Sequence, residues 1–149
     1  MVEVSTAAVG VVLACAGGEA LDRLVVPARA AAARLAEDET ILRCDAGEAQ
    51  DIAREVLDRL AATDPDALVR DVSEAWTAAV LRGSDARDAF AFLSALELPD
   101  EGFVQGEVVR VPAKVFAERD RIVLLVPAMW EHHLHDRLRR RLAHRGAAT

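Results

Sequence analysis

Hydrophobic and polar residues follow one another along the first half of the chain in blocks that predict both strands and helices. Residues 9–15 are apolar and rich in β-branched side chains, which predicts a buried strand that ends at a Gly-Gly pair. Residues 19–24 predict a helix of one or two turns. Residues 47–63 carry apolar side chains on one helical face and charged side chains on the other, so an amphipathic helix is predicted there. A strand is predicted at residues 67–72.

The second half opens with a similar order of elements. Residues 76–81 predict a strand that Gly83 interrupts, after which Ser84 is expected to cap a helix with Asp85 in its first turn. Pro99 is expected to stop this helix. Its predicted buried residues are Ala86, Ala89, Phe90, Leu93 and Leu96.

The remainder of the second half predicts a loop near residues 101–103, then strands and a final helix. The strands are predicted at residues 107–111, 113–117 and 121–126, with a hairpin turn at 118–120. Pro112 indicates an edge position or a break, because proline has no N–H to donate to a strand neighbour. Pro127 suits the first turn of the final helix. The narrow apolar stripe of that helix consists of Trp130, Leu134, Leu138 and Leu142.

Residues 28–44 support two different structures. Their alanine-rich first part, residues 28–35, has the highest helix propensity in the chain, because alanine loses no side-chain entropy in a helix. The acidic residues 37–39, followed by an apolar run at 40–44, are instead typical of a turn that enters a strand. A helix and a β-hairpin therefore both remain open from the local pattern.

These elements together predict an α+β fold. We expect two pseudo-repeated split βαβ halves of the ferredoxin-like type, at about residues 1–72 and 73–149, with antiparallel-rich sheets. A chain of 149 residues is long enough for one ordinary domain. We therefore expect residues 1–149 to form a single compact domain.

Composition and charge narrow the classes of partner. Aromatic residues make up 4% of the chain, which leaves few rings to stack on bases, and a net charge of −7 repels phosphate backbones. The apolar run at residues 7–16 is too short to span a bilayer. Cys15 and Cys44 lie in apolar contexts and are expected to be small core residues in a reducing compartment. We expect a cytoplasmic protein with no nucleic-acid or membrane partner.

Candidate catalytic and metal-binding groups are few. Glu131 and His132 each lie about one helical turn from His135, but a closed metal site needs further ligands, and none is suitably spaced. Asp71 and Ser73 lack the Gly-x-Ser-x-Gly context of a hydrolase nucleophile and are expected to bind backbone groups where strands cross. We therefore assign no catalytic, cofactor-binding or metal-binding residue.

The residue types favoured at protein interfaces, tryptophan and arginine, gather in the second half of the chain. A core role is the alternative for the rings, and complementing the helix dipole is the alternative for the arginines. The candidate partner-contacting residues are Trp76, Phe103, Trp130, Arg137, Arg140 and Arg141.

Short motifs occur in a characteristic order after residue 70. They are Asp71-Val-Ser73 with Trp76, Gly83-x-Asp85, Phe103-x-x-Gly106, Leu124-Leu-Val-Pro127 and the helix from Trp130 to Leu138, with residues 34–42 upstream. In these motifs the chain resembles the γ-subunit family of heterotetrameric sarcosine oxidase, which is similar to the folate-binding domain of the glycine-cleavage T-protein. The motif positions of interest are Asp71, Ser73, Gly83, Asp85, Gly106 and Pro127.

The resemblance implies both a structure and a role. It implies a hairpin at residues 28–44 and a fold like that of the T-protein folate-binding domain. It also implies a non-catalytic accessory subunit that packs on a large flavoprotein subunit of a heterotetrameric oxidoreductase complex. Flavin, NAD and tetrahydrofolate are then expected in the partner subunits, and no cofactor in this chain. The alternative is a free-standing folate- or tetrahydrofolate-binding domain of the T-protein type.

Overall fold

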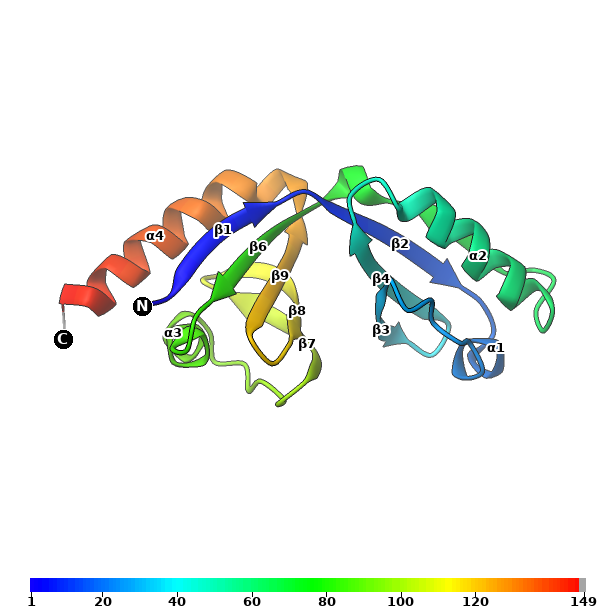
Figure 1. Cartoon of the computed structure of the whole chain (residues 1–149), viewed down its shortest axis with the longest axis horizontal. Coiled ribbons are helices and arrows are strands. Elements are labelled where there is room, and N and C mark those ends of the chain that lie inside the picture. The colour runs from blue at the N-terminus through cyan, green and yellow to red at the C-terminus, as the bar shows by residue number, and fades with distance from the viewer. Residues whose placement is uncertain (148–149) are drawn as a thin grey trace. The chain divides into compact units, whose positions relative to one another are not determined.

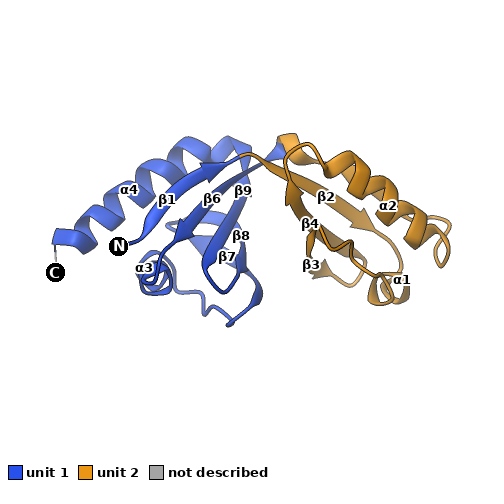
Figure 2. Ribbon diagram, in the orientation of Figure 1, with its two compact units in different colours: residues 1–7, 75–149 blue, residues 8–74 orange. Residues whose placement is uncertain are grey.

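The computed structural model describes residues 1–147 and has the predicted α+β architecture (Figure 1). The chain divides into two compact units (Figure 2). One unit is Ala8–Glu74, and the other combines Met1–Ala7 with the chain from Ala75 onward. Each unit has an antiparallel sheet with helices packed against it.

The unit Ala8–Glu74 contains strand, helix, strand, strand, helix and strand, in that order. The elements are β2 (Val9–Cys15), α1 (Gly18–Asp22), β3 (Ala31–Ala36), β4 (Glu39–Asp45), α2 (Ala49–Ala61) and β5 (Leu68–Asp71). The sheet order is β3-β4-β2-β5, and every neighbouring pair is antiparallel. This arrangement is the ferredoxin-like split βαβ unit that the sequence predicts.

Helix α2 supplies most of the helical side of the core in this unit. Its buried residues lie at helical spacing and pack with Val12 and Leu42 of the sheet. Val11 and Ile41, at alternate positions of β2 and β4, are also fully buried. Strands buried on both faces carry continuous apolar runs, which accounts for the pattern at residues 9–15. The α2 residues that are buried are Ala49, Ile52, Val56 and Leu60.

Strands β3 and β4 form the hairpin that one of the two interpretations of residues 28–44 predicts. Ala33 lies opposite Ile41, and the register shifts at a bulge between Arg34 and Ala36. Helix propensity differs among ordinary residues by at most about 0.7 kcal/mol per residue. The strand buries Ala33 and gives β4 a second neighbour. Tertiary pairing therefore overrides the local preference of the alanines.

The other unit begins with β1 (Glu3–Ala7), which pairs antiparallel with β6. After the turn η1 (Ser73–Ala75), its elements are β6 (Trp76–Arg82), α3 (Ala86–Leu93), β7 (Gly102–Val108), β8 (Val111–Ala117), β9 (Arg121–Pro127), η2 (Ala128–Trp130) and α4 (Glu131–Ala147). The sheet order is β1-β6-β9-β8-β7. Strand β1 lies at the edge of this sheet, next to β6. In the unit Ala8–Glu74, β5 has the equivalent edge position next to β2. The sequence did not predict β1, because its polar residues conceal a short strand.

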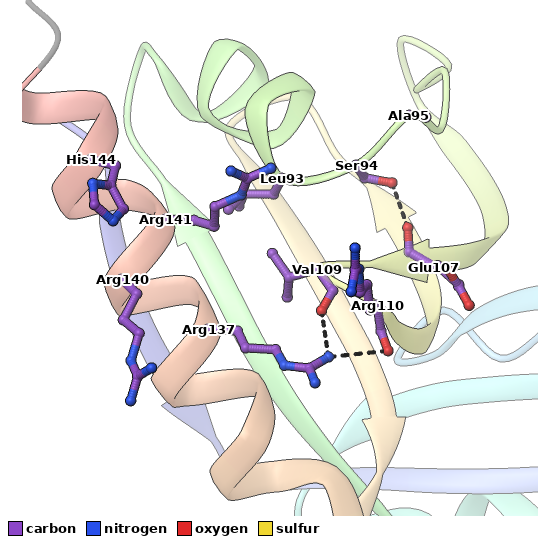
Figure 3. Close-up of a pocket in the computed structure, with 10 residues that line it drawn as sticks. All are labelled: Leu93, Ser94, Ala95, Glu107, Val109, Arg110, Arg137, Arg140, Arg141 and His144. Atoms are coloured by element: carbon purple, nitrogen blue, oxygen red, sulfur yellow. Dashed lines mark hydrogen bonds between the residues drawn. The ribbon is translucent and has the colours of Figure 1, made fainter.

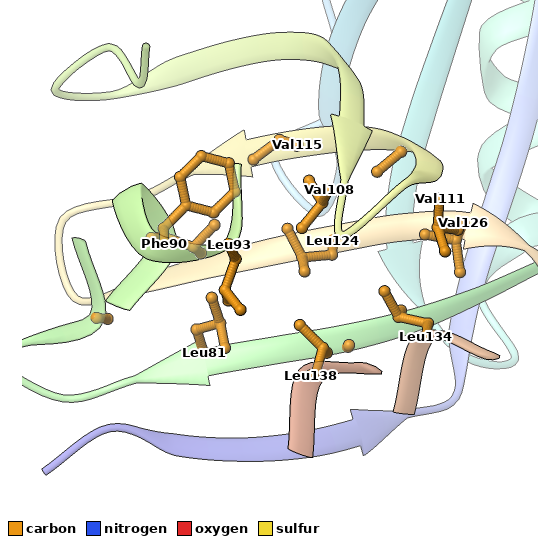
Figure 4. Close-up of a cluster of buried hydrophobic side chains, with 14 residues drawn as sticks. Leu81, Phe90, Leu93, Val108, Val111, Val115, Leu124, Val126, Leu134 and Leu138 are labelled. Atoms are coloured by element: carbon orange, nitrogen blue, oxygen red, sulfur yellow. The ribbon is translucent and has the colours of Figure 1, made fainter. Parts of the chain in front are cut away.

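Helices α3 and α4 share one core with the sheet of this unit (Figure 4). Phe90 and Leu93 come from α3, and Leu134 and Leu138 come from α4. The predicted stripe of α4 is confirmed as narrow, since its two fully buried members are Leu134 and Leu138. The rotation of α4 about its axis is therefore fixed by two leucines one turn apart.

The hairpin of β7 and β8 differs from the predicted strand at residues 107–111. Val109 and Arg110 have φ angles of 46° and 65° and form the two-residue turn between the strands. Strand β7 extends back to Gly102, where the sequence predicted a loop. β-Branched and long side chains rarely adopt positive φ, so the pair Val109-Arg110 carries no sequence signal of a turn.

Pro112 lies inside β8, at a position that resembles a sheet edge. It is paired with Glu107 of β7, but the ladder with β9 begins at Lys114. At Pro112 the strand thus has a neighbour on one side alone. Proline has no N–H to donate, and at this position no β9 residue is paired that would need one. This agrees with the predicted edge position.

Helix α3 begins one residue later than predicted, with Asp85 rather than Ser84 at the cap. The Asp85 side chain makes no capping hydrogen bond. Its carboxylate lies 3.5 Å from the Met1 amino group and 3.4 Å from Arg145 Nη1. The carboxylate therefore pairs with these two cations and does not cap the helix. Helix α3 ends at Leu93, so the predicted helical position Leu96 lies beyond it.

The two cysteines have different environments. Cys44 is buried, as predicted. The prediction that Cys15 is a core residue was wrong, because Cys15 is exposed. Cys15 is the last residue of β2 and lies opposite Leu68, which is itself 52% exposed. The apolar run therefore continues to the end of the strand, beyond the region that the core covers.

Candidate functional site

A groove of about 630 Å³ lies beside α4 (Figure 3). Helix α4 forms one wall, and the end of α3 with the β7–β8 hairpin forms the other. We call it the arginine groove, after its main chemistry. It is lined by Leu93, Ser94, Ala95, Glu107, Val109, Arg110, Arg137, Arg140, Arg141 and His144.

The four α4 residues of the groove lie on one face of the helix. Arg137, Arg140, Arg141 and His144 are separated by three, four and seven positions, which places their side chains in one stripe. Burial of Leu134 and Leu138 determines which way this stripe faces. The position of these four side chains thus follows from core packing on the neighbouring face of the same helix.

Two of the groove arginines are held by contacts other than ion pairs. Arg137 Nη1 donates to the carbonyl oxygens of Val109 at 2.9 Å and Arg110 at 3.3 Å, as the dashed lines of Figure 3 show. The guanidinium of Arg141 lies 5.3 Å from the ring centroid of Phe92, in cation–π geometry. Both contacts orient a guanidinium without neutralising its charge.

The opposite wall is fixed largely by backbone groups. Val109 N–H donates to the carbonyl of Leu93 at 2.9 Å. Ser94 Oγ donates to the carbonyl of Glu107 at 2.6 Å and accepts from the N–H of Leu96 at 3.1 Å. The Ser94 hydroxyl is therefore used in joining α3 to β7, and the groove keeps its shape through these bonds.

Positive charge dominates the groove. Among the groove residues, Glu107 alone is acidic, against four arginines. Arg140 Nη2 lies 3.0 Å from Asp136 Oδ2, and this is the one ion pair that the structure, over residues 1–147, gives a groove arginine. The other unit, Ala8–Glu74, differs in composition, with seven arginines against fourteen acidic residues. The arginine groove favours carboxylates or other anions through charge-assisted hydrogen bonds.

The sequence-predicted ring residues lie outside the arginine groove, and each is half-buried. Trp76 lines a separate hollow of about 400 Å³ that also includes Pro112 and Pro127, and Lys114 Nζ lies 5.9 Å from its ring centroid. Phe103 packs on Phe116 across the β7–β8 ladder, with ring centroids 5.3 Å apart.

Trp130, the third predicted ring residue, precedes α4. Its ring centroid is 5.6 Å from that of His133. The structure therefore brings together the three predicted arginines, but it places each predicted ring in a different environment.

Asp71 and Ser73 have the structural role that the sequence predicts. Ser73 Oγ accepts from the N–H of Val11 at 2.9 Å and donates to Asp71 Oδ1 at 2.5 Å. Asp71 Oδ1 also accepts from the N–H of Ser73 at 3.0 Å. The Ser73 hydroxyl thus accepts a hydrogen bond from the β2 backbone, just after the end of the neighbouring strand β5.

The remaining motif positions shape turns and close packing. Gly83 has a φ angle of 119°, a conformation that other residues rarely adopt. A side chain at Gly106 would lie 2.7 Å from Leu96 Cδ2, so the glycine lets Leu96 pack directly on β7. Pro127 ends β9 and precedes η2, one turn before the helix that the sequence expected it to open.

Asp85 is the motif position whose charge interacts with two cations, the Met1 amino group and Arg145. Desolvation would raise the pKa of its carboxyl group, but a backbone hydrogen bond, the Met1 amino group and Arg145 act in the opposite direction and together lower it. The charged form is therefore favoured. Because Arg145 is on α4, this pair ties the last turns of that helix to the start of α3.

Both cysteine thiols have raised pKa values. Burial raises the pKa of Cys44, with smaller contributions from Glu48 and Asp71, and desolvation followed by Glu39 raises the pKa of Cys15. No group of three or more His, Cys, Asp or Glu side chains in residues 1–147 is arranged to hold a metal ion. His132 is exposed, and Glu131 interacts with Thr77 instead.

Sequence reasoning missed two nitrogen-bearing members of the groove, Arg110 and His144. Arg110 lies in the unrecognised turn between β7 and β8, so its proximity to α4 had no local signal. His144 follows Arg137 by seven positions and Arg140 by four. That spacing was available in the sequence and places it on the same helical face.

Among residues 1–147, none of the helices combines the length and the apolar character that crossing a membrane requires.

Comparison with known proteins shows that this chain shares its fold with solved structures. No family model matches the sequence, and neither does any curated protein. The structure matches a chain of the heterotetrameric sarcosine oxidase from Corynebacterium sp. U-96, solved in complex with pyrrole 2-carboxylate. That match has a TM-score of 0.77 and 14% identity, and covers 96% of this chain and 84% of the other.

Two further solved structures share the architecture. Glycine cleavage system aminomethyltransferase T from Bartonella henselae matches with a TM-score of 0.64 and 15% identity, over 92% of this chain and 45% of that one. The regulatory subunit of aspartate kinase from Thermus thermophilus matches with a TM-score of 0.52 and 13% identity, over 93% and 97%. The predicted fold class is confirmed: the chain has the α+β fold found in sarcosine oxidase and the T-protein.

Proposed function

We propose that this chain is a non-catalytic accessory subunit, of the γ type, in a heteromeric amine oxidase related to sarcosine oxidase. In this proposal it packs on a large flavoprotein subunit. Flavin, NAD and tetrahydrofolate are bound by the partner subunits, and the complex works in the cytoplasm, where the two unpaired thiols remain reduced. The amine substrate is bound by the partner.

The observation that carries the proposal is the extent of the match to the sarcosine oxidase chain. It covers 96% of this chain and 84% of that chain, so the two are similar in length and consist of nearly the same elements. The T-protein match covers 45% of the T-protein chain, so that protein has much additional structure. The accessory-subunit proposal is therefore supported by coverage in both directions, since most of that sarcosine oxidase chain has a counterpart here.

The chemistry of the described residues supports an accessory role. The hydroxyls of Ser73 and Ser94 are used in bonds between elements of the fold. Both thiols have raised pKa values, which lowers their content of reactive thiolate. The arginine groove offers cations for binding, and its one serine hydroxyl is already hydrogen-bonded to the carbonyl of Glu107.

Co-expression tests the proposal. The chain is expressed with a tagged large flavoprotein subunit of the sarcosine oxidase type from the same genome, and the tag is used for purification. We expect the chain to co-purify in a fixed stoichiometric ratio through a size-exclusion column. A large subunit from an unrelated flavoprotein oxidase, carrying the same tag, serves as the control and should not bring the chain with it. A chain that elutes alone as a monomer in every pairing contradicts the proposal.

A free-standing tetrahydrofolate-binding domain is the second candidate, favoured by the T-protein match over 92% of the chain. Calorimetric titration of the isolated chain with tetrahydrofolate distinguishes it from the first. Saturable binding by the isolated chain supports the second candidate. The accessory-subunit proposal predicts no heat of binding until the large subunit is present.

A further inference from the structure

We propose that the arginine groove is the docking site for an acidic segment of the partner protein, with an apolar residue between its carboxylates. The partner's identity as the large flavoprotein subunit rests on the proposed function. The chemistry of docking rests on the groove itself. An extended segment would lie along α4, between that helix and the β7–β8 hairpin.

Charge is the first argument for this occupant. Arg137 and Arg141 are oriented by carbonyl groups and an aromatic ring, and neither contact supplies a negative charge. Helix α4 as a whole carries five arginines against two acidic residues. Clusters of arginines are a recurring means of recognising acidic motifs, because each planar guanidinium binds a carboxylate through two parallel hydrogen bonds.

The size and openness of the groove favour a peptide over a small molecule. From Arg137 to His144 the helix rises about 10 Å, which is the length of about three residues of extended chain. The Arg140 side chain is 75% exposed, although it lines the groove. Sites for small molecules bury about 70–90% of the ligand surface, which a groove with such an exposed wall does not achieve.

The apolar part of the groove accounts for the apolar residue in the proposed segment. Leu93, Ala95 and Val109 contribute to the wall opposite α4. Phe92, next to Leu93 in the sequence, is 40% exposed and carries the Arg141 guanidinium on its ring face, so it orients that arginine. A segment that alternates acidic and apolar side chains satisfies both parts of the groove at once.

Nucleic acid fits the groove less well than an acidic peptide does. The chain carries a net charge of −7, and this repels a long phosphate backbone beyond the short cationic stripe. Sequence-tolerant binding of single strands also relies on exposed aromatic platforms. The groove has none among its lining residues, and the neighbouring Phe92 ring already carries the Arg141 guanidinium on its face.

The ion pair between Arg140 and Asp136 gives the proposal a distinctive consequence. In the free protein Asp136 occupies the guanidinium that a partner carboxylate would bind. Removing the charge of Asp136 should therefore strengthen binding. An exposed pair is worth about 0.2–1 kcal/mol, so Asp136→Asn should raise the affinity by up to about fivefold.

The probe is a fluorescently labelled peptide of alternating glutamate and leucine, titrated with the full chain and followed by anisotropy. We expect saturable binding that weakens at least about tenfold in the double variant Arg140→Glu/Arg141→Glu. The control is Arg139→Glu, which reverses the charge of an exposed α4 residue outside the groove and should change affinity less than twofold. Circular dichroism confirms that each variant is folded.

Several results would overturn the inference. These are an absence of saturable binding, equal weakening by the Arg139 control, and a weaker affinity in Asp136→Asn. Equal binding of a glutamate–glycine peptide would refute the apolar contact. Displacement by inorganic phosphate at the same concentration as the peptide would identify a small-anion site, and tighter binding of oligouridine would identify a nucleic-acid site.

The two proposals fail in different ways. If the large subunit co-purifies but the peptide does not bind, the accessory role stands and this docking surface is wrong. If the peptide binds with the predicted variant effects but no large subunit co-purifies, the groove recognises acidic segments and the proposed complex is wrong.

Discussion

Replacing Leu138 by alanine tests whether two leucines hold α4, and with it the arginine groove, in place. Leu138 is 1% exposed and packs in the same core as Leu81 and Leu124 (Figure 4). Loss of its side chain loosens the helix on which Arg137, Arg140 and Arg141 stand. We expect the variant to unfold more easily and to bind the acidic peptide more weakly.

The magnitude follows from the burial of Leu138. Leucine to alanine removes three carbons, each worth about 0.8 kcal/mol of transfer free energy when fully buried, or about 2.4 kcal/mol in total. The cavity left behind raises this to about 3–4 kcal/mol. The higher helix propensity of alanine returns at most a few tenths of a kcal/mol. Leu134 is the one other fully buried α4 residue, and Leu142 packs on the same core only in part, so these contacts compensate for little of the loss.

Urea unfolding followed by tryptophan fluorescence measures the effect. Trp76 and Trp130 are the two tryptophans of the chain, and both lie in the unit that contains α4. Hydrogen exchange along α4 should also accelerate, because opening of the helix needs less free energy. Arg139→Ala, on the exposed face, should leave both measurements unchanged. An unfolding free energy within about 1 kcal/mol of the parent protein would refute the two-leucine account.

Two further predictions concern the unit Ala8–Glu74. Gly10→Ala should lower the unfolding free energy by about 3 kcal/mol, since a Cβ there would lie 2.6 Å from Cys44 Sγ and 2.7 Å from the Asp45 carbonyl oxygen. Gly17→Ala should be neutral when both variants are compared by thermal melting, since a Cβ there would make only an ordinary contact with Asp64 Oδ2 at 3.6 Å. Iodoacetamide should label Cys15 slowly near neutral pH and faster as the pH rises, since its pKa is raised. Cys44 should react only on unfolding, and mass spectrometry that finds it labelled first would contradict its burial.

Much of the fold was predictable because hydrophobic spacing reports which faces of an element are buried. The helix α2 and the strand β2 follow directly from that spacing. The hairpin of β3 and β4 did not, because its alanines favour a helix locally and are held in a strand by pairing with β4. The family resemblance, and not the local pattern, favoured the strands there.

The features that the sequence did not predict depend on contacts between distant segments. Strand β1 is polar on most of its length and exists because β6 offers it an edge. The turn at Val109 and Arg110 has no glycine or asparagine to mark it. That turn brings Arg110 to the groove beside the arginines of α4. Because the turn has no sequence signal, this part of the groove could not be predicted either.

The candidate site was predictable in part. Arg137, Arg140 and Arg141 were identified from composition and helical position, and the structure places them in one groove. Trp76, Phe103 and Trp130 were grouped with them because tryptophan and phenylalanine favour interfaces, but side-chain type does not specify which surface a ring reaches. Their separate environments follow from strand register, which the pattern of residues did not determine.

The most direct test of the accessory-subunit proposal is a calorimetric titration of the purified chain into a purified large flavoprotein subunit of the sarcosine oxidase type. The account predicts saturable one-to-one binding that the double variant Arg140→Glu/Arg141→Glu weakens and Arg139→Glu does not. No heat of binding to any large subunit from the same genome, with both proteins folded, would contradict it.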